Sequence, residues 1–120
     1  MQFPTGPVHK DFVPVLRYAE VLLNLAEAKA RLAGASVDAS ALALLNAVRG
    51  RSTTAYTAAD FANSTALVNA ILTERRIEFL GEGFRSIDLQ RNNLPLPAKA
   101  NIAAIPTLQL LIFGKFHKQK

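Results

Sequence analysis

Glutamates recur every four residues in the middle of the chain, at Glu74, Glu78 and Glu82. If one helix continued through them, their carboxylates would share the stripe that carries Leu67 and Ile71 further upstream. Carboxylates arranged in this way could hold a metal ion in a helical bundle, or serve as the acid and base of glycoside hydrolysis. The stripe therefore raises two chemical hypotheses that the rest of the sequence must decide.

The composition disfavours both hypotheses. A carboxylate metal site of the bundle type pairs its glutamates with histidines at Glu-x-x-His spacing, but the only histidines are His9 and His117, near the two ends. Adjacent helical turns could separate two carboxylates suitably for hydrolysis, yet arginines crowd them and favour ionised, structural carboxylates. The chain also has no cysteine, and we find no cofactor-binding loop or nucleophile. We therefore expect no enzyme activity, no metal and no cofactor.

The arginines suggest a structural role for the same glutamates. Arginine binds carboxylates through two parallel hydrogen bonds, so arginines between the glutamates would satisfy them and relieve their repulsion. We expect a partly buried ion-pair network that fixes how the helices cross, and that specifies geometry more than it adds stability. Its predicted members are Arg17, Glu20, Arg49, Glu74, Arg75, Glu78, Glu82, Arg85 and Asp88.

Helices must position these residues. A run rich in Ala, Leu, Glu and Arg predicts a helix over 15–33, closed by Gly34, and a short apolar helix should end at Arg49 after a cap at Asp38 or Ser40. Thr57 and Asp60 have the spacing of a capping box. A third helix is predicted over 64–80, ended by Gly81 and Gly83, and a short fourth over 84–91.

No segment alternates as a half-buried strand does, so the predicted fold is all-α. The helix pairs are typical of antiparallel hairpins of the tetratricopeptide type, although no 34-residue repeat is visible. We divide the chain into an N-terminal extended segment (1–11), a helical segment (12–93) and an irregular tail (94–120). The first helix has only a narrow polar stripe and needs neighbours on more than one side, so we expect Tyr18 to pack in the core.

The net charge of +5 could indicate an acidic partner such as nucleic acid. However, Lys115, Lys118 and Lys120 lie at the extreme C-terminus, where a basic tail is usually solvated. We therefore expect no nucleic-acid partner. No stretch reaches the 18 apolar residues of a membrane span, and the start does not read as a signal peptide, so an export signal and lipid anchor would lie upstream of this chain.

Three sequence elements resemble a known family. Arg-Tyr-Ala-Glu-Val-Leu-Leu-Asn-Leu-Ala-Glu-Ala at 17–28 and Leu-Asn-Ala-Val-Arg-Gly-Arg at 45–51 are similar to two signatures of SusD-like (RagB/SusD) proteins. The third element comprises Ile-Leu-Thr-Glu-Arg-Arg-Ile-Glu-Phe at 71–79, Glu-Gly-Phe-Arg at 82–85 and Asp-Leu-Gln-Arg at 88–91. The match covers about 12–91 and corresponds to the C-terminal part of a family member. After it, Pro95-Leu96-Pro97 follows sooner than in the family pattern.

The resemblance implies a non-catalytic outer-membrane lipoprotein with a tetratricopeptide-like scaffold. Such a protein holds glycans or other nutrients at the cell surface and passes them to a partner TonB-dependent transporter. No ligand-binding residue is carried over to this chain, and Tyr56, which could stack on a sugar, stays undecided. The alternative is a stand-alone helical module that binds a peptide or protein in a groove.

Overall fold

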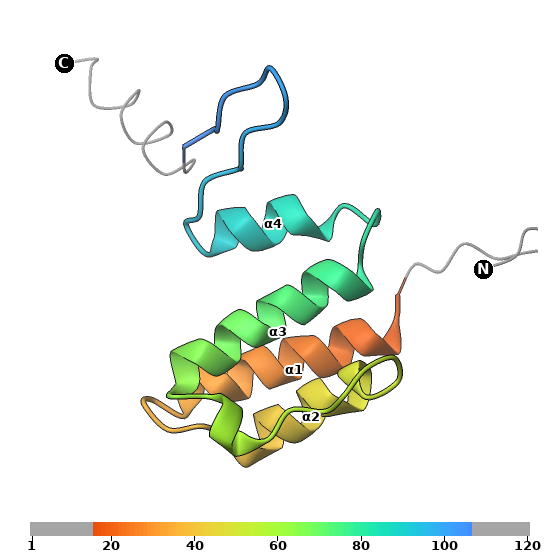
Figure 1. The fold of residues 1–120 in the computed structure, drawn as a ribbon, viewed down its shortest axis with the longest axis vertical. Helices are drawn as coiled ribbons and strands as arrows, with labels where there is room; N and C mark the ends of the chain where they lie inside the picture. The colour runs from red at the N-terminus through yellow and green to blue at the C-terminus, as the bar shows by residue number, and fades with distance from the viewer. Residues whose placement is uncertain (1–15, 107–120) are drawn as a thin grey trace, which may run out of the picture.

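The computed structural model describes residues 16–106. The described part contains four α-helices and one 3-10 turn, and it contains no strand, which confirms the predicted all-α fold and its helical hairpins (Figure 1). The elements, in order, are α1 (Tyr18–Leu32), α2 (Ala39–Arg49), η1 (Ala58–Asp60), α3 (Ser64–Glu78) and α4 (Phe84–Arg91). The predicted extended segment 1–11 lies outside the described residues.

The first hairpin joins α1 to α2. After α1 ends at Leu32, Gly34 takes a φ of +68°, a left-handed conformation that glycine adopts without strain, as predicted for the stop of this helix. Of the two candidate caps for α2, Asp38 is used, and its carboxylate accepts a hydrogen bond of 2.6 Å from the amide N–H of Ala41.

Side-chain hydrogen bonds fix the conformation of the loop after α2. The side chain of Asn46 donates to the Tyr56 carbonyl and accepts from the Tyr56 amide, each at 2.8 Å. Asp60 accepts hydrogen bonds from both the amide and the hydroxyl of Thr57, so the predicted capping spacing forms the η1 turn.

The buried Ser64 hydroxyl at the start of α3 donates to the Ala30 carbonyl on α1, and this hydrogen bond connects the two helices.

The hydrophobic core lies between α1, α2 and α3, and α1 packs against both of the others (Figure 1). Leu23, Leu45, Leu67 and Ile71 are completely buried. Several core positions of α1 and α2 are alanines, which allow close approach of the two helices. These alanines are Ala19, Ala26, Ala30 and Ala41.

The prediction that Tyr18 packs in the core is wrong, because its side chain is 75% exposed. The face of α1 that contains Leu23 turns towards α2 and α3, and the opposite face is left outside. That outer face carries Tyr18, Val21, Leu25 and Leu32, which recur at the spacing of one helical stripe. We call these four residues the outer stripe of α1.

Two glycines connect α3 to α4. Helix α3 ends at Glu78, two residues before its predicted limit, and Gly81 and Gly83 then take φ values of +86° and +84°. The chain therefore turns back, and α4 runs alongside α3 (Figure 1). Beyond α4, the chain doubles back in a loop closed by antiparallel bridges between Leu96 and Ile105 and between Lys99 and Ile102. The rest of the predicted irregular tail lies outside the described residues.

Candidate functional site

A chain of ion pairs connects α1, α3 and α4. Arg75 of α3 contacts Asp88 of α4 at 2.9 Å, and each of these side chains is only 4% exposed. Asp88 also contacts Arg91 at 2.8 Å, and Arg91 crosses to Glu27 of α1 at 2.6 Å. Glu27 contacts Arg31 at 2.7 Å. We call this series, from Arg75 to Arg31, the three-helix ion chain.

Arg75 is the most heavily used residue of the three-helix ion chain. Its Nε donates to Asp88 and its Nη1 to the side-chain oxygen of Asn24 on α1. The guanidinium also lies 5.5 Å from the ring centre of Phe79 and 6.0 Å from that of Phe84, at cation–π distance. These two rings are themselves in contact, with centroids 4.9 Å apart. One side chain thus holds α1, α3 and α4 together.

The electrostatics of Glu27 and Arg91 follow from their pairing. Burial raises the pKa of Glu27, but hydrogen bonds and charges from Arg91 and Arg31 outweigh it and hold the pKa of this carboxyl below its usual value. The hydrogen bond to Glu27 raises the pKa of Arg91 above its usual value. Both groups are therefore charged at neutral pH, and the pair is a bidentate one, since Nη1 and Nη2 of Arg91 each contact one oxygen of Glu27.

A second cluster joins the start of α1 to the end of α3. Arg17 contacts Glu78 and Glu82, and it also donates to the backbone carbonyl of Glu78 at 3.1 Å. Arg51, in the loop after α2, contacts the same carboxylate of Glu78 at 2.8 Å. Glu78 is thereby shared between two arginines from different elements, and its side chain is 13% exposed.

A third contact joins α2 to α3. Arg49 contacts Glu74 at 3.1 Å, and it also donates to the Thr54 carbonyl at 2.9 Å. Its guanidinium lies 4.0 Å from the ring centre of Tyr56. Tyr56 is half-buried between this arginine and Phe61, so its ring face is already in contact with protein.

The structure brings together most of the predicted network residues. Glu20 and Arg85 make no ion pair with any residue in the described range 16–106. Since α3 ends at Glu78, Glu82 reaches Arg17 from the glycine turn and not from the helical stripe that the sequence suggested. The predicted residues that do form ion pairs are Arg17, Arg49, Glu74, Arg75, Glu78, Glu82 and Asp88.

Sequence reasoning missed three members of the three-helix ion chain, namely Glu27, Arg31 and Arg91. Two spacings could have indicated them, because Glu27 and Arg31 are four residues apart on one helix and Asp88 and Arg91 are three apart. The link between Glu27 and Arg91 spans 64 residues and carries no local signal.

The carboxylates of these clusters are engaged in ion pairs with arginines. Within residues 16–106, no group of three or more His, Cys, Asp or Glu side chains is placed to hold a metal ion. Every buried side-chain nitrogen or oxygen in that range has a hydrogen-bond partner. None of the described helices combines the length and apolarity that a membrane crossing requires.

The comparison with protein families gives one match. The profile of the SusD family matches residues 5–115, which is nearly the whole chain. No curated protein and no solved structure matches the chain significantly. The chain therefore belongs to the SusD family of glycan- and nutrient-binding proteins.

Proposed function

We propose that this chain is a non-catalytic scaffold segment of a SusD-like glycan- or nutrient-binding protein that acts with a TonB-dependent transporter. The family match over residues 5–115 carries this proposal. The parent protein would lie at the surface of the outer membrane, attached by a lipid anchor. Its partners would be the transporter and the nutrient.

The scaffold role is supported by the placement of the charged residues. The three-helix ion chain and the Arg17 cluster use their carboxylates to join helices, and Arg75 and Asp88 are nearly inaccessible to any ligand. Buried ion pairs of this kind fix the relative orientation of the helices, since the hydrogen bonds between the two partners form only in one geometry. The predicted members of the network that form ion pairs are therefore proposed to position the helices that the parent protein packs against.

The outer stripe of α1 favours contact with a further protein element. Its side chains are between 45% and 87% exposed, although an apolar helical face is normally covered. The same stripe would serve the alternative function, a stand-alone helical module that binds another protein. Monomeric behaviour and cooperative unfolding of the 120-residue chain by itself would favour the module over the segment.

Two glutamates with contrasting partners test the scaffold role. In the full-length parent, Glu78→Ala leaves Arg17 and Arg51 without their shared carboxylate, and should lower stability by about 1 kcal/mol. Glu20→Ala is the matched control, because Glu20 has no ion pair among residues 16–106. Melting temperature and affinity for the nutrient are both measured. An unchanged melting temperature together with lost binding in Glu78→Ala would overturn the scaffold role.

The proposed partnership with a transporter is tested by examining the upstream coding sequence and the neighbouring genes. An upstream coding sequence with a lipoprotein signal, and a neighbouring transporter gene, are the expected findings. Their absence would count against the uptake complex and in favour of the stand-alone module.

A further inference from the structure

Four basic side chains within residues 16–106 make no ion pair, and three of them gather in one place, whereas the fourth, Lys29, lies on α1. Within residues 16–106, six arginines are ion-paired, namely Arg17, Arg31, Arg49, Arg51, Arg75 and Arg91. Arg76, Arg85 and Lys99 contact no carboxylate of that range. These three side chains line one cavity of about 420 Å³ beside Gly81 and Gly83, and no acidic residue lines it. We call it the basic cavity.

The start of α4 adds to the positive character of the basic cavity. The first amide groups of a helix have no partner within the helix, and together they carry a partial positive charge. Asp38 and Asn63 cap α2 and α3 with side-chain oxygens, but Gly83 at the same position of α4 has no side chain to do so. The donors at this end of α4 thus lack the side-chain acceptor that α2 and α3 have.

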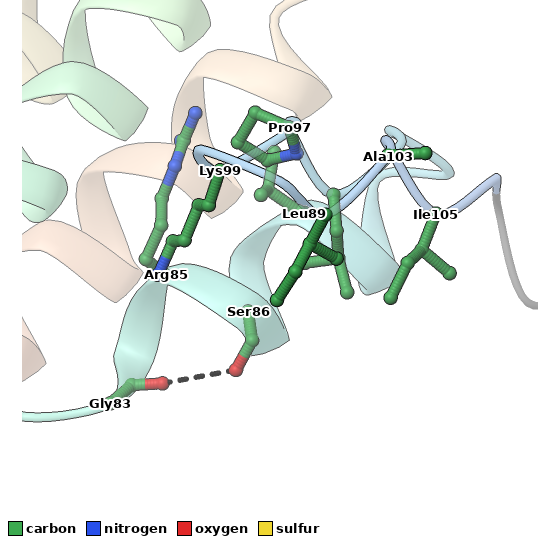
Figure 2. A pocket seen from close by; sticks show the side chains of 10 residues that line it. Gly83, Arg85, Ser86, Leu89, Pro97, Lys99, Ala103 and Ile105 are labelled. Carbon is green, nitrogen blue, oxygen red and sulfur yellow. Dashed lines mark hydrogen bonds between the residues drawn. The ribbon is translucent and has the colours of Figure 1, made fainter.

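An apolar cavity adjoins the basic one. It measures about 450 Å³ and lies between α4 and the loop 96–105 (Figure 2). Arg85 and Lys99 line both cavities, and Figure 2 shows them at the end where Pro97 lies, away from Ile105. The apolar walls are provided by Leu89 of α4 and by Leu96, Pro97, Ile102, Ala103 and Ile105 of the loop.

We propose that the two adjoining cavities form one binding site for a small organic anion. Its oxyanion group would lie among Arg76, Arg85 and Lys99, and its apolar part against Leu89 and the loop. Like charges held together repel, and an anion between them removes that repulsion. A carboxylate suits the planar guanidinium of arginine because both oxygens can be contacted at once. The site is separate from the scaffold role and does not depend on it, since Arg76, Arg85 and Lys99 make no ion pair in the network.

Three probes separate the contributions of charge and apolar surface. Hexanoate carries both a carboxylate and an apolar chain, whereas acetate carries only the charge and 1-hexanol only the chain. Binding to the whole protein is followed by NMR titration at low salt. We expect hexanoate to bind roughly tenfold more tightly than either other probe, and to weaken as salt is added.

Variants then locate the site. The double variant Arg85→Gln/Lys99→Gln should reduce hexanoate binding to the level of 1-hexanol, and Ile102→Ser should reduce it towards that of acetate. Lys29→Gln is the matched control, because it removes one positive charge from α1 and Lys29 lines neither cavity. Arg85 and Ile102 are exposed, so these variants should fold, which circular dichroism checks.

Several results would overturn the proposal. Equal binding of hexanoate and 1-hexanol would show that charge plays no part in recognition. Full binding by a correctly folded double variant, or an equal loss in Lys29→Gln, would place the anion elsewhere. No detectable binding of hexanoate would remove the site altogether.

Discussion

Helices α2 and α4 are held to the rest of the fold by different forces. Helix α2 packs against α1 through Ala41, Leu45 and Val48, which are all buried and apolar. Helix α4 buries only Asp88 and Leu89, and its firmest connections are the ion pairs of Asp88 with Arg75 and of Arg91 with Glu27.

The two helices should therefore detach in different ways. Apolar packing has no preferred direction and does not depend on pH, and its loss is felt through the whole core. An ion pair requires both partners in one geometry and in one protonation state, and removal of one partner leaves the other charge buried. We therefore expect α2 to unfold with the core, and α4 to be the helix that detaches separately.

The largest effect should follow from removing a buried partner at α4. Asp88→Ala leaves the guanidinium of Arg75 in a site where its side chain is 4% exposed, and we expect a loss of about 3–5 kcal/mol in the free energy of unfolding. Denaturant unfolding measures the loss, and hydrogen exchange should show α4 deprotected first. Glu82→Ala is the control, since its pair with Arg17 is partly exposed and should cost about 1 kcal/mol or less. Equal losses in the two variants would contradict the comparison.

A somewhat smaller effect, spread over the core, is expected at α2. Leu45 is completely buried, and Leu45→Ala should cost about 2–5 kcal/mol through lost burial and the cavity left behind. Hydrogen exchange should then accelerate together in α1, α2 and α3. Leu80→Ala serves as the control, because Leu80 is 82% exposed and its loss should change stability by no more than about 0.5 kcal/mol. If the faster hydrogen exchange in Leu45→Ala were confined to α2, this helix would also detach separately, and the comparison would be wrong.

The smallest effect, and the one most specific to α4, is a loss of the stability of this helix at low pH. The pKa of Glu27 lies below its usual value, so its contribution to stability is complete above the unfolded value of 4.5 and is lost as the pH falls through the folded value. Protection of α4 should therefore decrease as the pH falls below about 4.5, before that of α2 does. In Glu27→Gln this part of the pH dependence should disappear. If α2 lost protection first, the distinction between the two helices would be wrong.

Local signals in the sequence predicted most of the fold. The capping residue Asp38, the glycine stop at Gly34 and the Thr57–Asp60 pairing act over a few residues, so each could be read without tertiary context. The sequence predicts an end for α3 that is two residues late, because Phe79 and Leu80 continue the apolar pattern although the helix has already ended.

Two features could not be read in this way. Helix α1 is apolar on two opposite faces, and the sequence could not tell which face the core would cover, so Tyr18 was assigned to the wrong side. The pairing of Glu27 with Arg91 depends on the direction in which Gly81 and Gly83 return the chain. That direction is a property of the packed helices and leaves no spacing pattern in the sequence.

The several roles of Arg75 restrict what can replace it. A lysine would keep the positive charge, but its single ammonium group could not donate to Asp88 and Asn24 in the fixed fork of a guanidinium while also lying at cation–π distance from two aromatic rings. Substitution at this position should therefore be tolerated only with a second change on α4 or α1. In family members that carry another residue here, we expect Asp88, Asn24 or Phe84 to differ as well, so that these positions vary as one group during evolution.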